Sequence, residues 1–413
     1  MASSVEFVEN SMPRRIAIIS GSCPPAGAGG IATAHYNLYR ALTKRGHEAR
    51  IFTFGDYDVP SCEPDIIRAG APPWFDKSVL ALTRAFFRLI EPGTLSYHVS
   101  EVIRVAWPCL GLRGAIQRFT PDILLLPDHC CPGLLIGTPA HCKTILVSHH
   151  NPARFLDNPL WRLHSQLDAR LTIMCENRVL RRVDTVVCPS PYMKNMFAKT
   201  YAYQGPVRVI PNVVDVELIA SVPARNLRRE LNLSDDALVV YIPSAGNIYK
   251  GSRYVMEIIR RLSSHTAKDL GFYLSGALTP ELAYELRLAP RNAKLYAPGH
   301  ISYAENMAIV KGCSFGVSPT LLESFGMTLL EASHCGVPMV TFNVGGNADV
   351  VCHGKNGFLV PFLDVESLIS TSQRLMDGSF REHIRHETAG HAREMSNADS
   401  AAEEYNSLVI ERA

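Results

Sequence analysis

The chain has 413 residues, of which 47% are hydrophobic, and this length suits two domains of about 200 residues each better than a single core. Its net charge of +2 gives little support to nucleic-acid binding. Eleven cysteines without a disulfide-scaffold spacing, a polar N-terminal stretch and the lack of an apolar run of about 18 residues favour a cytoplasmic protein that does not span a membrane.

Short apolar runs alternate with helical patterns along the chain. The first series covers 15–20, 49–54, 122–127, 143–148, 185–190 and 207–212. The second series covers 238–244, 271–276, 293–299, 314–318, 337–342 and 357–361. Such runs are typical of parallel strands buried on both faces. The sequence therefore predicts an α/β fold of two doubly wound, Rossmann-like domains over 1–215 and 216–385, followed by a helical segment over 386–413.

A glycine-rich loop follows the first run and leads into an amphipathic helical pattern, with Gly29 and Gly30 next to the helix. Gly27, Gly29 and Ala32 also fit a GxGxxA dinucleotide fingerprint, and Asp56 follows the second run as the acidic partner. The loop is too long for the tight turn of that fingerprint. An NAD-dependent oxidoreductase therefore stays an alternative rather than the main interpretation.

The segment 74–91 is strongly apolar, and helical geometry would place Lys77, Arg84 and Arg88 within about 40° of one another. A basic stripe beside an aromatic face suggests peripheral contact with a membrane. The alternative is a helix that packs on its own domain with a solvated basic edge, which is the commoner arrangement.

His149 and His150 follow the run 143–148, at the end of the strand where doubly wound sheets bind ligands. Adjacent side chains on an extended backbone point to opposite sides, so only one of the two is expected to face a ligand. A purely structural histidine at the strand end is the alternative.

Two groups of residues imitate metal sites. Asp56, Tyr57 and Asp58 resemble a DxD motif, while a second group gathers possible zinc ligands at His129, Cys130, Cys131, His141 and Cys142. Adjacent ligands on extended backbone diverge, and the DxD motif lies in the half that is not expected to hold phosphates. No metal site is predicted.

Lys250 ends the loop that follows the run 238–244, and Arg253 comes three residues later. A lysine at this place can neutralise a diphosphate, although a solvated lysine in a glycine-containing loop would look the same.

The run LLESFGMTLLEASHCGVP (321–338) carries the strongest signal in the chain. The turn of Ser324, Phe325 and Gly326 precedes a helical pattern from about Met327, and a helix start offers unpaired amides and a positive dipole end to a phosphate. Glu323 precedes the turn, and we expect Glu331 to fall in the first helical turn, where a carboxylate could accept hydrogen bonds from sugar hydroxyls. The alternative is an acidic helix start on a surface loop.

This run resembles the ExxxxxxxE signature of retaining glycosyltransferases of family 4, which have the two-domain GT-B architecture. By the same resemblance, the helical segment 386–413 could return to the first domain. The resemblance implies that Glu323 lies by the transferred sugar, that Glu331 binds the nucleotide ribose, and that the Phe325 and Gly326 amides hold the distal phosphate. It extends to Gly29 and Gly30, which match the family's first glycine pair near the acceptor or the donor phosphates. One histidine of the pair His149 and His150 matches a residue that faces the transferred sugar. The segment 345–361, with its Gly-Gly pair before a helix, is also similar.

The chain departs from the family pattern in two places. The family usually has an arginine about five residues before Lys250, where this chain has Ser244, Ala245 and Gly246. Either Arg253 supplies that charge, or Lys250 and the turn amides stabilise the leaving group without it. Val213 also replaces the usual glycine after Asn212.

The resemblance implies a metal-independent enzyme that moves a sugar, with retained configuration, from a nucleotide diphosphate sugar to a glycan, glycolipid or small-molecule acceptor in glycan biosynthesis, without a further cofactor. The predicted catalytic residues are Glu323, Lys250, His149 and His150. The predicted donor-binding residues are Gly29, Gly30, Lys250, Arg253, Ser324, Phe325, Gly326, Met327 and Glu331. Besides the oxidoreductase, a nucleotide-sugar epimerase and a noncatalytic nucleotide-sugar-binding partner remain as alternatives.

Overall fold

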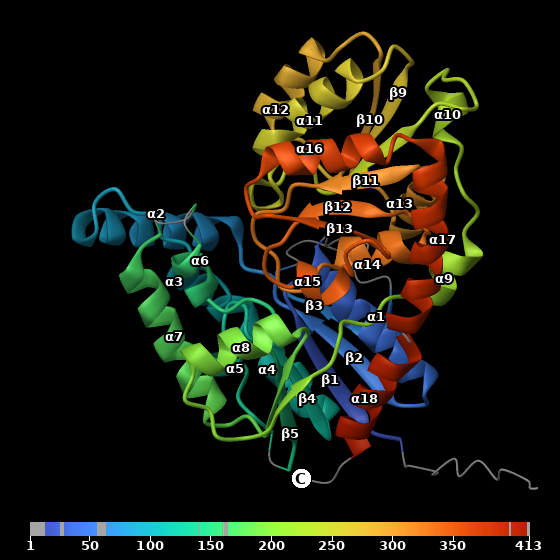
Figure 1. Ribbon diagram of the computed structural model, residues 1–413. Helices are drawn as coiled ribbons and strands as arrows, with labels where there is room; N and C mark the ends of the chain where they lie inside the picture. Colours follow the sequence, from blue (N-terminus) through green and yellow to red (C-terminus); the bar gives the residue numbers. More distant parts are fainter. Residues whose placement is uncertain are drawn as a thin grey trace, which may run out of the picture. The chain divides into compact units, whose positions relative to one another are not determined.

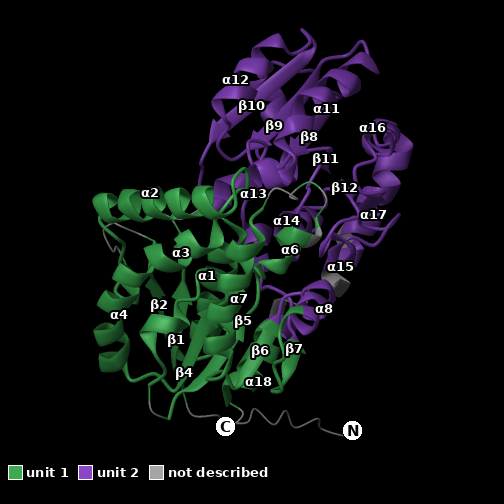
Figure 2. Cartoon of the chain, turned by 90° about the vertical axis from the view of Figure 1, so that its left-hand side faces the viewer, with its two compact units in different colours: residues 1–187, 200–208, 402–413 green, residues 188–199, 209–401 purple. Residues whose placement is uncertain are grey.

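A computed structural model describes residues 13–24, 29–55, 63–139, 141–158, 160, 164–395 and 398–410. The backbone divides into two compact units, which Figure 2 colours separately. Unit 1 comprises Met1–Val187, Thr200–Arg208 and Ala402–Ala413, and unit 2 comprises Cys188–Lys199 and Val209–Ala401. Gly27 and the DxD lookalike at 56–58 lie outside the described residues.

The first sheet has seven strands in the order β3-β2-β1-β4-β5-β6-β7. The strands are β1 (Arg15–Ser20), β2 (Glu48–Thr53), β3 (Ile66–Arg68), β4 (Ile123–Pro127), β5 (Lys143–Val147), β6 (Thr185–Cys188) and β7 (Val207–Val209). All five residues of β4 and of β5 are buried. This burial on both faces agrees with the apolar sequence of β4 and of residues 145–147 in β5, whereas β5 begins with the polar Lys143 and Thr144.

The helices of this half connect the strands in the manner of a doubly wound fold (Figure 1). They are α1 (Gly30–Lys44), α2 (Pro73–Ile90), α3 (His98–Arg104), α4 (Ala106–Phe119), α5 (Gly133–Ile136), α6 (Ala153–Asp157) and α7 (Gln166–Leu180). The last helix, α18 (Ala398–Ile410), also docks on unit 1, where Lys143 Nζ donates to the Leu408 carbonyl at 3.0 Å and His47 Nε2 lies 2.7 Å from Asn406 Oδ1.

The second sheet has six strands in the order β10-β9-β8-β11-β12-β13. They are β8 (Val239–Ile242), β9 (Leu270–Ser275), β10 (Ala293–Gly299), β11 (Phe315–Ser318), β12 (Met339–Phe342) and β13 (Gly357–Val360). The recorded pairs in both sheets are parallel, as buried apolar strands predict.

Helix α8 (Pro191–Thr200) connects β6 to β7 of the first sheet, and α9 (Val216–Ser221) and α10 (Leu227–Glu230) lie between β7 and β8. The helices that follow β8 are α11 (Ser252–Ser264), α12 (Pro280–Glu285), α13 (Tyr303–Gly312), α14 (Met327–His334), α15 (Asn347–Val350), α16 (Val365–Arg374) and α17 (Gly378–Met395), and short 3-10 turns occupy η2 (Ile248–Lys250) and η3 (Leu286–Leu288). None of the helices in the described part of the chain combines the length and apolar character needed to cross a membrane.

The predicted α/β fold with two doubly wound sheets is confirmed, and each of the twelve predicted runs contains a strand. The sequence prediction missed β3, which has three residues at the edge of its sheet, only one of them fully buried. Such a strand has too few apolar positions to stand out from the surrounding loop.

Candidate functional site

The loop after β11 forms the core of the candidate site in unit 2. The Tyr249 carbonyl, in the loop after β8, accepts hydrogen bonds from the amides of Leu321 (2.9 Å) and Leu322 (3.2 Å). A Cβ atom at Gly251 would lie 2.0 Å from the Pro319 carbonyl oxygen, so the two loops touch at a position that admits no side chain. The loop that carries Lys250 is thereby fixed against the loop that carries Glu323.

A pair of glycines supports the other side of the same turn. A Cβ atom at Gly345 would lie 2.0 Å from the Glu323 carbonyl oxygen, and one at Gly346 would lie 2.4 Å from that of Ser324. The Gly346 amide also donates to the Glu323 carbonyl at 3.3 Å. The Gly-Gly pair before α15 therefore sets the path of the turn from Glu323 to Phe325.

Within this frame, a lysine and two backbone amides converge on one carboxylate. Lys250 Nζ lies 2.5 Å from Glu323 Oε2, and Oε1 of the same carboxylate accepts from the amides of Ser324 (3.1 Å) and Phe325 (3.5 Å). The Glu323 side chain is 11% exposed and that of Lys250 24%. Hydrogen-bond donors that bind a carboxylate can also bind a phosphate, because both groups are anions with several acceptor oxygens.

Gly326 ends the turn and α14 begins at Met327, as predicted. Met327 itself is buried. Ser190 Oγ donates to the Ser324 carbonyl at 2.8 Å, a support for the turn that the sequence analysis did not identify because Ser190 lies 134 residues away.

Glu331 differs from its prediction in position. It is the fifth residue of α14, so it lies in the second helical turn and not in the first, and it is 6% exposed. Burial raises its pKa to about 8, and the nearby phenol of Tyr303 opposes this shift. At neutral pH Glu331 is therefore mainly protonated, so its carboxyl group can donate as well as accept a hydrogen bond.

Arg253 lies on the exposed side of α11. Its Nη2 donates to the Tyr254 hydroxyl at 2.9 Å, and its guanidinium lies 4.8 Å from the centre of the Tyr254 ring. The structure thus places Arg253 on Tyr254, and its role in donor binding stays a prediction.

In unit 1, a buried aspartate organises the loop after β5. Asp128, which follows β4 and is 4% exposed, accepts hydrogen bonds from Ser148 Oγ (2.9 Å) and from the amides of His149 (3.0 Å), His150 (2.9 Å) and Asn151 (3.2 Å). The sequence analysis missed Asp128. A single polar residue directly after a buried strand was the available signal.

The two adjacent histidines contact different neighbours. The His149 ring lies 5.4 Å from that of His35, whereas the His150 ring lies 4.7 Å from that of His129 and 5.1 Å from that of His98. Burial lowers the pKa of His150 well below its usual range, and the neighbouring histidines lower it further. A neutral imidazole of this kind binds a hydroxyl group through hydrogen bonds and is a poor acid.

Gly29 and Gly30, the glycine pair of the first loop, lie at the start of α1 and are exposed. A Cβ atom at Gly29 would meet nothing within 4 Å. The pair lies where a loop leads into a helix in unit 1, as the sequence predicted.

The histidines and cysteines at 129–131 and 141–142, which imitate a zinc site in the sequence, do not converge on a common point. Over the described residues, no group of three or more His, Cys, Asp or Glu side chains is placed to hold a metal ion. Burial raises the pKa of Cys130 and of Cys131 well above the usual thiol value, so both are neutral thiols at pH 7.

Two doubly wound parallel sheets, with the Glu323 turn after β11 and the Lys250 loop after the neighbouring β8, have the arrangement of the GT-B class of two-domain α/β proteins. Two family models agree with this class. "Glycosyltransferase Family 4" matches residues 28–218 and "Glycosyl transferases group 1" matches residues 224–406. The chain belongs to the family 4 glycosyltransferases of GT-B fold.

Individual glycosyltransferases are also similar to this chain in sequence. A D-inositol 3-phosphate glycosyltransferase of Catenulispora acidiphila is 23% identical over 90% of this chain and 88% of its own length. An uncharacterized glycosyltransferase of Methanocaldococcus jannaschii is 27% identical over 43% of this chain, and the match spans only 46% of that protein.

Solved structures share the fold. The sucrose-phosphate synthase of Thermosynechococcus elongatus superposes with a TM-score of 0.71 at 20% identity, over 96% of this chain and 98% of that one. Anabaena HepE in complex with UDP and glucose superposes with a TM-score of 0.69 at 16% identity, over 96% and 99%.

Proposed function

We propose that this chain transfers a sugar from a nucleotide diphosphate sugar to an acceptor, with retention of configuration and without a metal ion. The observation that carries the proposal is the convergence of Lys250 Nζ and the Ser324 and Phe325 amides on one anionic group. These donors suit the diphosphate, whose negative charge increases as the bond to the sugar breaks.

In this proposal the diphosphate takes the place beside Lys250 that the Glu323 carboxylate holds in the structure. Two anions repel each other at one set of donors, so Glu323 would turn to the hydroxyl groups of the transferred sugar. Lys250 and the turn amides would supply the charge stabilisation that other enzymes obtain from a metal ion.

Glu331 is proposed to bind the ribose of the donor. Because its carboxyl group is mainly protonated at neutral pH, it can donate a hydrogen bond to one ribose oxygen and accept one from a ribose hydroxyl. His149 or His150 is proposed to bind a hydroxyl of the transferred sugar, with Asp128 holding the backbone of both histidines.

The identity of the nucleotide is proposed from the structural neighbours. HepE is seen with UDP and glucose, so UDP-sugars come first among the donors to test. Retention is proposed from membership of family 4.

The test is a panel of UDP, GDP, ADP and TDP sugars incubated with the purified protein in the presence of EDTA, with release of nucleoside diphosphate and donor binding both measured. We expect one donor to bind and to be turned over once an acceptor is present, and Lys250→Ala to lower the rate by about a hundredfold or more. Lys355→Ala is the matched control, because Lys355 is an exposed lysine of unit 2 in the turn before β13. Absence of binding by every donor, or equal rates for Lys250→Ala and the control, would refute the proposal.

A further inference from the structure

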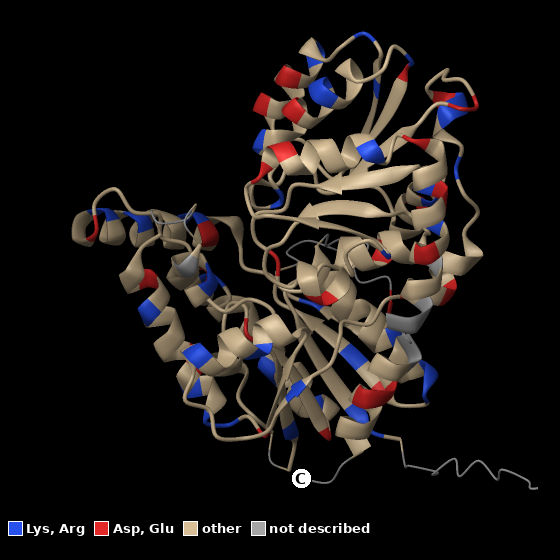
Figure 3. Ribbon diagram, in the orientation of Figure 1, with Lys and Arg blue, Asp and Glu red and all other residues tan. Residues whose placement is uncertain are grey.

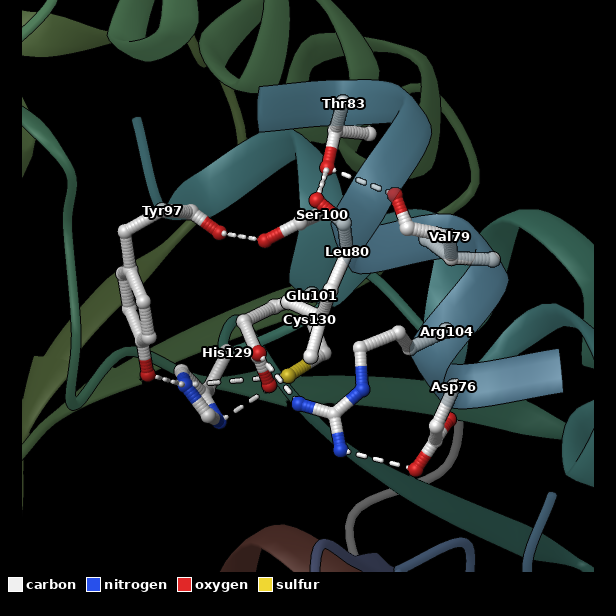
Figure 4. Close-up of polar contacts among 10 residues, drawn as sticks. All are labelled: Asp76, Val79, Leu80, Thr83, Tyr97, Ser100, Glu101, Arg104, His129 and Cys130. Atoms are coloured by element: carbon white, nitrogen blue, oxygen red, sulfur yellow. Dashed lines mark hydrogen bonds and ion pairs between the residues drawn. The ribbon is translucent and has the colours of Figure 1, made fainter. Parts of the chain in front are cut away.

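Helix α2 is attached to unit 1 along one narrow face. Val79, Thr83 and Phe87 are buried, and the Thr83 hydroxyl donates to the Val79 carbonyl at 2.7 Å, so that face presents no unsatisfied hydroxyl. Asp76 pairs with Arg104 of α3 at 2.9 Å, and Arg104 also binds Glu101 at 2.7 Å (Figure 4). The helix is thus held in a defined orientation on α3.

The face of α2 that points away from these contacts is apolar and exposed. Trp74 is 61% exposed, Leu82 71%, Phe86 48% and Leu89 84%. At about 100° per residue these four side chains fall within about 120° of one another. Ser78 also lies on this face, and its hydroxyl donates to the Trp74 carbonyl at 2.8 Å. A group of large exposed apolar side chains of this kind marks an interaction surface, whereas single exposed apolar residues do not.

A basic stripe borders that face. Lys77, Arg84 and Arg88 are exposed, and none of the three forms an ion pair with any residue that the structure describes. In Figure 3, where lysine and arginine are blue, blue segments lie along α2. Asp76, an acidic residue of the same helix, forms its ion pair with Arg104, so the edge of α2 that carries the basic stripe keeps a net positive charge.

Helix α4 extends the apolar face beyond the N-terminal end of α2. Trp107 is 49% exposed and its ring lies 5.9 Å from that of Trp74 and 5.7 Å from that of Phe75. Leu110, on the same helix, is 56% exposed. Indole rings are amphipathic and are favoured at the level of lipid headgroups.

We propose that α2, with Trp107 and Leu110 of α4, forms a docking surface for an anionic lipid bilayer. The apolar side chains would enter the boundary between headgroups and acyl chains, while Lys77, Arg84 and Arg88 contact the anionic headgroups. The charge complementarity selects a membrane over an uncharged apolar partner. The surface is formed by residues of unit 1 and the Glu323 turn by residues of unit 2, and the membrane proposal does not depend on the donor chemistry.

The test is co-sedimentation of the 413-residue chain with two kinds of vesicle, one of phosphatidylcholine with phosphatidylglycerol and one of phosphatidylcholine alone. We expect binding to the anionic vesicles, weaker binding at high salt, and little binding to the neutral ones. Leu82→Glu with Leu89→Glu, and separately Arg84→Glu with Arg88→Glu, should each lower the partition by about tenfold or more.

A matched control is Arg287→Glu with Leu288→Glu, which makes the same kinds of change at an exposed basic and an exposed apolar residue of unit 2. This control should bind vesicles like the unchanged protein. Thermal unfolding and donor binding of each variant, measured without vesicles, show that the protein is folded.

Three results would overturn the proposal: no sedimentation with anionic vesicles, equal loss in the control, or a dimer by light scattering that Leu82→Glu with Leu89→Glu dissociates while vesicle binding is absent. The last result would assign the surface to a second copy of the chain. Because vesicle binding is measured without donor, its failure leaves the transferase proposal untouched, and the converse also holds.

Discussion

Each half of the molecule places a carboxylate against backbone amides at the end of a parallel strand, yet the two carboxylates are used differently. Asp128 in unit 1 is 4% exposed and accepts hydrogen bonds from one hydroxyl and three amides. Glu323 in unit 2 is 11% exposed and interacts with Lys250, whose side chain is 24% exposed, and with two amides of its own turn. Asp128 is buried and satisfied within its own unit, as expected for a structural residue, whereas Glu323 is the carboxylate that we propose a ligand anion replaces beside Lys250.

The largest effect is expected from Glu323→Gln. We expect kcat to fall by about a hundredfold or more, because the uncharged amide cannot hold the transferred sugar as a carboxylate does. The melting temperature should change little, since the Lys250 partner is partly exposed and can be solvated. Steady-state kinetics and calorimetry check both statements, and a large loss of stability with unchanged kcat would reverse the assignment of Glu323.

Asp128→Ala should show the opposite pattern. It removes the shared acceptor of the Ser148, His149, His150 and Asn151 donors, and unpaired buried donors destabilise a protein by about 1–3 kcal/mol each. We expect the free energy of unfolding of unit 1 to fall by about 3 kcal/mol, measured by urea denaturation. Asp128→Asn keeps an acceptor oxygen and should lose less; equal losses would show that the acceptor is not what matters.

The different predictability of these two carboxylates has a physical cause. Glu323 lies in a contiguous run of 18 residues with its turn and its helix, so its position beside the turn amides could be inferred locally, although its partner Lys250 lies 73 positions earlier. Asp128 acts on amides 21 to 23 positions later, and nothing local reveals that contact.

The same difference between local sequence signals and contacts of distant residues explains which other parts of the fold could be predicted. The buried strands were predictable because continuous apolar runs leave few alternatives, while β3 was not. The periodicity of 74–91 predicted an amphipathic helix, but only the position of α3 decides that Val79, Thr83 and Phe87 form the packed face. The second-turn position of Glu331 follows from the helix beginning at Met327, four residues before it.

Gly345→Ala should have a smaller effect that tests how the turn is supported. The new Cβ atom would lie 2.0 Å from the Glu323 carbonyl oxygen, and the backbone also has a φ of +56° that disfavours a side chain. We expect a loss of about 2 kcal/mol of stability together with weaker donor binding. Gly354→Ala separates the two causes, because Gly354 also has a positive φ of 82° but a Cβ atom there meets nothing within 4 Å. Equal effects of the two substitutions on donor binding would contradict the role of Gly345 in shaping the turn.

The smallest expected effect concerns pH, and it again separates the two halves. Burial raises the pKa of Glu331 from 4.5 to about 8, so between these values the folded protein keeps a proton that the unfolded chain has released. Stability from this group is therefore lost as the pH rises, by about 1 kcal/mol between pH 7 and pH 8. Below pH 4.5 the group has no effect, because both states are protonated.

Unit 1 should respond in the opposite direction. Burial lowers the pKa of His98 to about 4, with His164 and His129 lowering it and Asp168 raising it, so the unfolded chain takes up a proton first as the pH falls below 6.5. Acid therefore destabilises the histidine cluster and alkali destabilises the environment of Glu331. Glu331→Gln should remove the alkaline slope in urea denaturation at pH 7 and pH 8, and the exposed Glu281→Gln should keep it. If both variants retain the slope of the unchanged protein, Glu331 is ionised in the folded state, and the ribose would then meet a carboxylate that only accepts hydrogen bonds.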